Sequence, residues 1–227
     1  MIRAALLDID GTLLDSNNAH AQSWVEAFEA HGLSVPFTKV RPLIGMGGDR
    51  LLHEVASIEE DSVHGKAISE TRVRIFREKY LANLEAFPEV RALLQKMKEV
   101  GLKLVVATSA GEDLLEDLLE RAHVNDLIEK RTSSDDAEQS KPAPDIVQAA
   151  LKKAGLRPEE AIMLGDTPYD LEAAARAGVR SVALESGGWG IADLTNAQAV
   201  YKDAADLLAH FDHSPFARAE SPSAAAH

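Results

Sequence analysis

The second half of this sequence alternates regularly between two kinds of hydrophobic pattern. Stretches with helical periodicity are separated by short apolar runs of the length of a buried strand. The predicted helices cover 89–100, 112–122, 145–154, 168–177 and 203–210, and the predicted strands cover 102–107, a weak one at 127–128, 161–165, 179–184 and 199–201. Alternation of this kind predicts a parallel sheet with helices on both of its faces.

The first half departs from that alternation after a single strand. Residues 2–7 form an apolar run that fits a strand buried on both faces. From Ser16 to Glu85 only helical patterns follow, at 16–30, 36–43, 50–56 and 60–84. We therefore predict an α/β fold, a doubly wound parallel sheet with an inserted α-helical cap subdomain. Its core spans 1–15 and 86–212, its cap spans 16–85, and the Ala-, Ser- and Pro-rich tail 213–227 is expected to be disordered.

Composition narrows the classes of partner. The chain has 227 residues, a formal net charge of −13 and no cysteine. The negative charge argues against nucleic acid and anionic membrane surfaces as partners, and the missing thiols exclude disulfides. The sequence has no signal-peptide pattern and no apolar run that could span a bilayer, so a cytoplasmic protein is expected.

Polar residues follow the predicted strands. In open parallel sheets ligands bind at the carboxyl ends of the strands, so these positions are expected to converge. One lysine stands in the polar loop between the second and third of these positions. The residues concerned are Asp8 and Asp10, Thr108 and Ser109, Asp166 and Asp170, and the loop lysine Lys141.

The charges at this edge require compensation. Two carboxylates 4 Å apart repel by about 4 kcal/mol at an effective dielectric of 20, so several acids coexist only with a cation or with raised pKa values. An all-oxygen set without Cys or clustered His favours Mg²⁺ over zinc. Helix N-termini, Thr108, Ser109 and Lys141 would supply donors to a phosphate. The alternative for Asp8 and Asp10 alone is a solvated turn.

Four segments together resemble the ordered motifs of the haloacid dehalogenase superfamily. They are Asp8-Ile-Asp10-Gly-Thr-Leu, the strand end Thr108-Ser109, Lys141 in Ser-Lys-Pro-Ala-Pro-Asp, and Gly-Asp166-Thr-Pro-Tyr-Asp170. The helical insertion after the first strand is similar to that of the phosphoglycolate phosphatase and β-phosphoglucomutase branch. The resemblance extends to about His210.

The resemblance implies a phosphatase mechanism for a small phosphomonoester. Asp8 would be the nucleophile that forms an aspartyl-phosphate, and Asp10 would act as general acid and then as general base. Mg²⁺ would be held by Asp8, the Asp10 backbone carbonyl, Asp166 and Asp170. Thr108 and Lys141 would hold the phosphoryl oxygens.

Other candidates keep a structural alternative. Gly11, Thr12 and Ser109 are candidate substrate-binding residues, although Thr12 and Ser109 could instead cap or brace the backbone. His20 could touch substrate or be a structural helix residue. Arg50, in the Gly-rich cap loop 45–50, either clamps a second anionic group or stays in solvent, and Asp170 could serve only as a first-turn acid of its helix.

Two other functions fit the same motifs. A phosphosugar mutase of the β-phosphoglucomutase type would use the same nucleophile, and the chain resembles those enzymes at His20 and Trp24. It has Ile44 and Gly48 where they carry basic residues, which disfavours the mutase. A non-catalytic phospho-switch module would need no helical insertion and is shorter.

Overall fold

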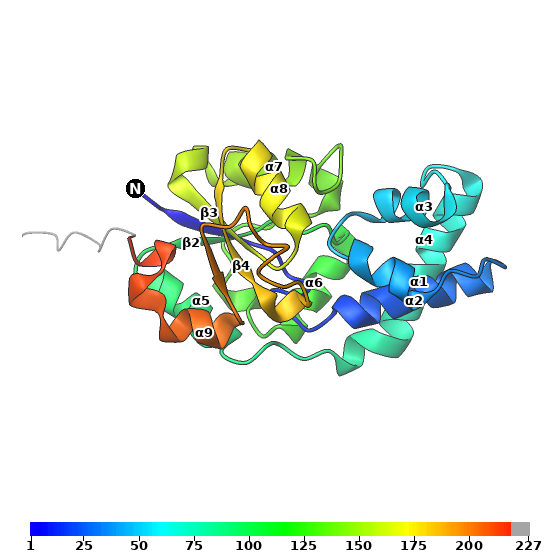
Figure 1. Cartoon of the computed structure of the whole chain (residues 1–227), viewed down its shortest axis with the longest axis horizontal. Helices are drawn as coiled ribbons and strands as arrows, with labels where there is room; N and C mark the ends of the chain where they lie inside the picture. Colours follow the sequence, from blue (N-terminus) through cyan, green and yellow to red (C-terminus); the bar gives the residue numbers. More distant parts are fainter. Residues whose placement is uncertain (219–227) are drawn as a thin grey trace, which may run out of the picture.

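The computed structural model describes residues 1–218 and consists of a sheet with helices on both faces beside a group of helices (Figure 1). Five parallel strands form one sheet in the order β2-β1-β3-β4-β5. The strands are β1 Ala4–Leu7, β2 Lys103–Val106, β3 Ala161–Gly165, β4 Arg180–Leu184 and β5 Ala199–Tyr201. The predicted doubly wound parallel sheet is confirmed.

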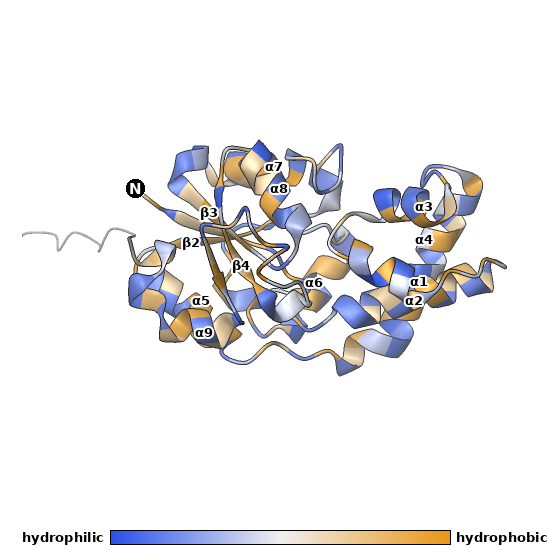
Figure 2. Ribbon diagram, in the orientation of Figure 1, coloured by the Kyte–Doolittle hydropathy of each residue, from blue (hydrophilic) through white to orange (hydrophobic). Residues whose placement is uncertain are grey.

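The helices that follow β2 to β5, together with α5, cover the sheet. They are α5 Val90–Glu99, α6 Glu112–Arg121, α7 Asp145–Ala154, α8 Pro168–Arg176 and α9 Ala204–Ala209. Alternate strand residues face opposite ways, as the period of two requires. Ala5 and Leu7 pack with α5, α6 and α9, whereas Ala4 and Leu6 pack with α7 and α8. Figure 2 shows the strands as an apolar centre with hydrophilic positions along the outer helices.

The segment after β1 is helical and has a hydrophobic cluster of its own, which includes Trp24, Phe28, Leu52 and Ile68. Its elements are α1 Asn17–Ala30, α2 Phe37–Val40, the 3₁₀ turn η1 Arg41–Leu43, α3 Gly48–Ala56, α4 Val63–Ile75, the π-helical turn η2 Phe76–Tyr80 and the 3₁₀ turn η3 Leu81–Asn83. Figure 1 shows these helices (blue to cyan) beside the sheet region. We refer to residues 16–85 as the cap and to the remainder as the core.

Two segments of the chain connect the cap to the core. The Asp15 N–H donates to the Glu85 carbonyl at 3.0 Å, and the Phe87 N–H donates to the Leu13 carbonyl at 3.2 Å. The cap is therefore attached by two short strand-like segments that lie side by side, directly after the acids of β1.

The structure differs from three sequence predictions. The weak strand at Leu127-Ile128 is wrong: Asn125–Leu127 form a 3₁₀ turn, η4, and the bridge to β2 is made by Lys130 with Val105. The single helix over 60–84 is broken, because the Ser62 hydroxyl accepts from the Gly65 N–H and starts α4 at Val63, while η2 and η3 end it.

The third difference concerns the tail predicted to be disordered from residue 213. Phe211–His213 and Pro215–Arg218 form the 3₁₀ turns η8 and η9, and Phe216 is buried against the core. The low hydrophobicity of the tail concealed one buried aromatic anchor. Residues 219–227 lie outside the described residues.

Three further 3₁₀ turns link the core elements: η5 Ser134–Asp136, η6 Pro158–Glu160 and η7 Glu185–Gly187. No helix within residues 1–218 is long and apolar enough to cross a membrane.

Candidate active site

The register of the sheet brings the predicted acids together. Leu7 lies opposite Val106 on one side and opposite Leu164 on the other. Asp8 is therefore level with the residues that follow β2 and with the last residue of β3, and Thr108 and Asp166 lie close by. The chain also reverses its strand order here, between β1 and β3, which is where ligands bind in sheets of this type.

Lys141 lies buried between two carboxylates. Its Nζ donates to Asp8 Oδ1 and to Asp170 Oδ1, each at 2.6 Å, and no part of Lys141 is exposed. Burial opposes the lysine charge, but the two carboxylates outweigh burial and raise its pKa. Burial raises the pKa of Asp8 well above its usual value, against the lowering effect of Lys141. The lysine thus partly neutralises a site that still carries excess negative charge.

Asp166 is held by neutral donors. Thr12 Oγ1 donates to its Oδ1 at 2.8 Å, and Asn17 Nδ2 donates to its Oδ2 at 3.0 Å. Burial and the nearby Asp170 charge raise the pKa of Asp166 to about 8. Close backbone approach completes the enclosure, because a Cβ on Gly11 would lie 2.1 Å from Asp166 Oδ2. Gly11, with φ +81°, is also a position that favours glycine.

These acids fit a hard divalent cation. One oxygen from each of Asp8, Asp166 and Asp170 lies within 4.8 Å of the others, and all three residues are buried. Burial and the neighbouring carboxylates raise the pKa values of Asp8 and Asp166, and a bound cation would favour their ionised forms. An oxygen-only donor set of this kind suits Mg²⁺.

Asp170 has a second, structural contact. Its Oδ2 accepts from the backbone N–H of Thr167 at 3.0 Å and from Thr167 Oγ1 at 2.7 Å, which closes a capping box at the start of α8. The same carboxylate binds Lys141 through Oδ1. Asp170 is therefore the first-turn acid of α8 and at the same time a partner of Lys141.

Asp10 lies on the cap side of Asp8 and belongs to a different network. Ser16 Oγ donates to its Oδ1 at 2.5 Å, and His20 Nε2 lies 2.8 Å from the same oxygen. Burial alone would raise the pKa of Asp10, but its contacts with His20 and Ser16 and the nearby Arg72 charge lower it overall. Asp10 and Asp8 are thus pushed in opposite directions by their surroundings, as expected when two acids have different tasks.

Arg72 of α4 fixes the state of His20. Its Nη2 lies 2.5 Å from His20 Nδ1, and a guanidinium can only donate, so Nδ1 accepts and Nε2 carries the hydrogen given to Asp10. Burial and the nearby Arg72 charge lower the pKa of His20, against the opposing effect of Asp10. The ring stacks on Phe76 with centroids 4.1 Å apart, and Arg72 lies over Trp24.

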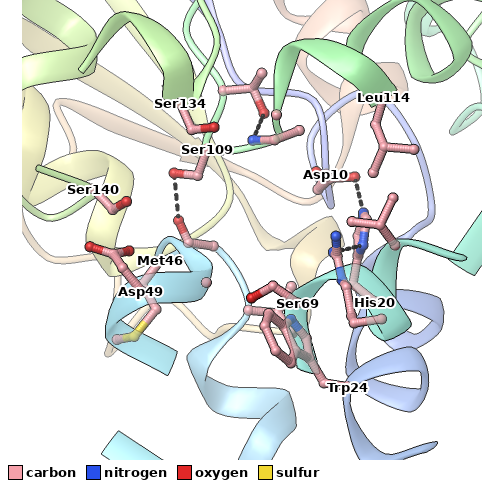
Figure 3. Close-up of a pocket in the computed structure, with 18 of the residues that line it drawn as sticks. Asp10, His20, Trp24, Met46, Asp49, Ser69, Ser109, Leu114, Ser134 and Ser140 are labelled. Carbon is pink, nitrogen blue, oxygen red and sulfur yellow. Dashed lines mark hydrogen bonds and ion pairs between the residues drawn. The ribbon is translucent and has the colours of Figure 1, made fainter. Parts of the chain in front are cut away.

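A cavity of about 210 Å³ opens between the core and the cap above these acids. Figure 3 shows Asp10 and His20 on one side, Asp49 and Ser140 on the other, and Ser69 with Trp24 on the cap side. The part of the lining that comes from the core consists mainly of residues with carboxylates and hydroxyls. In the cap, helices α1, α3 and α4 contribute residues to the lining. The charged residues, histidine, serines and threonine of the lining are Asp8, Asp10, His20, Asp49, Glu60, Ser69, Arg72, Thr108, Ser109, Asp113, Ser134 and Ser140.

The predicted substrate-binding residues separate into three groups. Thr108, Ser109 and His20 line the cavity, and Ser109 Oγ also donates to the Gly45 carbonyl of the cap loop at 3.4 Å. Gly11 and Thr12 lie against Asp166 instead, so Thr12 braces that carboxylate.

Arg50 and Lys141 do not line the cavity. Lys141 lies beneath Asp8, at the base of the site. Arg50 is partly buried, and its Nε has no hydrogen-bond partner among the described residues.

Several site residues were not identified from the sequence. Ser16 and Asn17 contact the site acids Asp10 and Asp166 directly, and Arg72 contacts His20, which lies against Asp10. Ser16 and Asn17 directly follow the Asp-rich motif, and their position was a usable signal. Arg72 lies in a helix rich in charged residues, where nothing distinguishes an inward arginine from solvated ones.

Comparison with known proteins gives a consistent result. The family model described as haloacid dehalogenase-like hydrolase matches residues 5–184. The chain is 33% identical over 186 residues to a Caldanaerobacter subterraneus subsp. tengcongensis protein provisionally named pyrophosphatase PpaX, covering 81% of this chain and 82% of that protein. It is 32% identical over 193 residues to phosphoglycolate phosphatase 1 of Pseudomonas aeruginosa, covering 82% and 70%. The crystal structure of a hydrolase from Pseudomonas syringae superposes with a TM-score of 0.86 at 31% identity, covering 93% of this chain and 98% of that one.

Proposed function

Because this chain belongs to the haloacid dehalogenase-like hydrolases, we propose that it is a Mg²⁺-dependent phosphatase of small phosphorylated metabolites with Asp8 as its nucleophile. The observation that carries the proposal is the pairing at the end of β1. Asp8 is fixed through Oδ1 by Lys141, while Asp10 lies beside the cavity in a separate network. One acid is thus prepared for attack and the other for proton transfer.

The reaction has two steps. In the first, an Asp8 carboxylate oxygen attacks phosphorus, the bond from phosphorus to the ester oxygen breaks, and Asp10 gives that oxygen its proton. In the second, a water molecule attacks phosphorus, Asp10 takes the proton from the water, and inorganic phosphate leaves Asp8. In the free protein burial raises the pKa of Asp10, but the contacts of His20 lower it overall. The negative phosphoryl group raises its proton affinity on binding, which allows it to act as the acid.

The surrounding residues prepare this chemistry. Lys141 would hold Asp8 and the phosphoryl oxygens, and Thr108 would donate to the phosphoryl group from the end of β2. Asp8, Asp166, Asp170 and the Asp10 backbone carbonyl would hold Mg²⁺, with Thr12 and Asn17 orienting Asp166. The bound ion would neutralise negative charge on the phosphoryl group. His20 and Arg72 would orient Asp10.

The cavity lining favours one substrate type over another. The sequence leaves phosphoglycolate and sugar phosphates as the two types. Arg72 is the only lysine or arginine that lines the cavity among the described residues, and it already faces His20. Asp49, Glu60 and Ser69 line the cap end instead. Carboxylates and hydroxyls accept hydrogen bonds from sugar hydroxyls but repel a second anionic group. We therefore favour a neutral, hydroxyl-bearing leaving group of the sugar phosphate type.

The same lining bears on the mutase alternative. A phosphosugar mutase must retain a bisphosphate while it turns over, and each phosphoryl group needs positive charge. With Arg72 as its sole lysine or arginine, the cavity lining described here offers little for a second phosphoryl group. The phosphatase is therefore the preferred activity.

The decisive experiment replaces the nucleophile. Asp8→Asn should reduce hydrolysis of p-nitrophenyl phosphate in the presence of Mg²⁺ by at least about a thousandfold, and chelation of Mg²⁺ should do the same to the unaltered protein. Asp212→Asn, which alters an exposed aspartate in η8, is the matched control and should retain full activity. Retention of activity by a folded Asp8→Asn variant would refute the assignment.

A further inference from the structure

One arginine of the cap reaches the core loop that covers Asp166. Arg41, at the start of η1, donates from Nη2 to the Gly187 carbonyl at 2.6 Å and from Nε to Asn18 Oδ1 at 2.8 Å. Gly187 ends η7, the turn that follows β4. This contact joins the cap to the Mg²⁺ side of the site and lies outside the cavity lining. We call Arg41, Asn17, Gly187 and Asp166 the Arg41 junction.

The loop and Asp166 are packed too closely to move independently. A Cβ placed on Gly187 would lie 1.7 Å from Asp166 Oδ2, so only glycine allows the backbone to approach this carboxylate. Ser186 Oγ donates to the Gly11 carbonyl at 2.7 Å, which ties the same loop to the turn after β1. A shift of Gly187 therefore shifts or releases Asp166.

Asn17 connects the junction to the first turn of the cap. Its Nδ2 lies 3.0 Å from Asp166 Oδ2 and 3.5 Å from the Gly187 carbonyl, and the residue is 2% exposed. Its Oδ1 is buried and has no partner among residues 1–218. Asn17 and Asn18 open α1, so the Nε donor of Arg41 acts at the base of the cap and its Nη2 donor acts on the core.

The charge of Arg41 and a hydrogen bond to Pro42 add to the link between this segment and the site acids. Burial lowers the pKa of Arg41, and the charges of Asp166 and Asp15 oppose that shift, so the guanidinium is within electrostatic reach of the carboxylate. Tyr169, the residue before Asp170, donates from its hydroxyl to the Pro42 carbonyl at 2.8 Å. Residues 41 and 42 thus contact the segments that hold both Asp166 and Asp170.

We propose that Arg41 is a positioning residue that couples the placement of the cap to the affinity of the core for Mg²⁺. With the cap seated, Arg41 holds Gly187 against Asp166 and keeps the carboxylate oriented for the ion. With the cap displaced, the loop around Gly187 and the side chain of Asn17 no longer hold Asp166 in that orientation. Coupling between two equilibria is reciprocal, so Mg²⁺ bound in the core also stabilises the seated cap. The inference rests on the Mg²⁺ site proposed above.

The experiment measures Mg²⁺ binding directly, without substrate. By titration calorimetry, Arg41→Ala should bind Mg²⁺ about fivefold more weakly than the unaltered protein. Electrostatics alone predicts the opposite sign, because removing a positive charge beside Asp166 would strengthen binding of a cation. Arg41→Lys keeps the charge but loses the planar fork that spans Asn18 and Gly187, so its affinity should also fall.

Hydrogen exchange separates the two halves of the coupling. Mg²⁺ should protect both residues 181–190 of the core and residues 36–46 of the cap in the unaltered protein. In Arg41→Ala the core segment should still respond while the cap segment should not. Arg74→Ala, an exposed arginine of α4 paired with Glu78, is the matched control and should behave as the unaltered protein.

The outcomes are distinct. Unchanged or tighter Mg²⁺ binding in Arg41→Ala, or a cap response that persists in it, overturns the coupling while leaving the phosphatase proposal standing. Failure of Mg²⁺ to protect residues 181–190 in the unaltered protein overturns the metal site itself and the coupling with it.

Discussion

The core and the cap treat their carboxylates differently on the two sides of one cavity. On the core side, Asp8, Asp166 and Asp170 each accept at least one hydrogen bond from Lys141, Thr12, Asn17 or Thr167. On the cap side, Asp49 Oδ1 is buried without a partner in the described part of the chain, and Glu60 receives only a 3.4 Å contact from Ser69.

This contrast suits two different tasks, the chemical reaction and the choice of substrate. Carboxylates held by several donors have one orientation, which suits a reaction that recurs unchanged on every substrate. Acceptors that lack partners can receive hydrogen bonds from a ligand, and binding then supplies what the free protein lacks. We therefore propose that the core side carries the reaction and that the cap side distinguishes different substrates.

The largest effect should come from replacing Lys141, the buried lysine on the core side of the site. Lys141→Met leaves Asp8 and Asp170 buried without their partner, so we expect a loss of about 3–5 kcal/mol in the free energy of unfolding. Urea unfolding at neutral pH measures it. Lys153→Met removes an exposed partner of Asp136 and should cost at most about 1 kcal/mol. Equal losses in the two variants would show that the buried pairing of Lys141 with Asp8 and Asp170 contributes no more than an exposed ion pair.

A smaller effect should appear in the pH dependence of Mg²⁺ stabilisation. The pKa of Asp166 is raised from 3.8 to about 8. A carboxyl with a raised pKa favours folding at low pH, and this contribution is lost as pH rises through about 8. Mg²⁺ stabilises the ionised form, so its addition should raise the melting temperature by about 3 °C more at pH 8.5 than at pH 5.5. Asp166→Asn should abolish that difference, and a pH-independent shift would show that Asp166 does not respond to the ion.

The smallest effect should come from the cap side. Asp49→Asn removes one negative charge from the cavity lining, so turnover of phosphoglycolate should improve relative to a hexose phosphate. About 1 kcal/mol, or a fivefold change in the ratio of the two kcat/KM values, is expected for a partly screened charge. Asp61→Asn alters an exposed acid of the same subdomain and should leave the ratio unchanged. An unaltered ratio in Asp49→Asn would place substrate selection elsewhere.

The sequence predicted the sheet and its acids because local patterns determine both. Asp8, Thr108 and Asp166 follow apolar runs whose ends a parallel sheet must align, and the observed register confirms that alignment. Element boundaries at α7 and β3 agree with the prediction, since Gly155 ends the helix in the left-handed conformation and the strand is a continuous apolar run.

What the sequence did not predict depends on contacts between the two subdomains. Arg41 and Arg72 stand among solvated charges in the chain, and only tertiary packing shows that one reaches Gly187 and the other His20. The orientation of an arginine on a short or highly charged helix is not set by periodicity. Phe216 was missed for a similar reason, because a single aromatic residue in a polar segment gives no pattern.

The shared use of Asp170 limits how this enzyme could be redesigned. An engineer who wished to change the metal preference of the proposed Mg²⁺ site would first consider lengthening, shortening or neutralising its carboxylates. At Asp166 such a change would meet the glycine-lined loops. At Asp170 it would also remove the capping box that starts α8, because the same carboxylate accepts two hydrogen bonds from Thr167. Directed evolution of this site should therefore recover altered metal preference more readily through the donors around Asp166 than through replacement of Asp170.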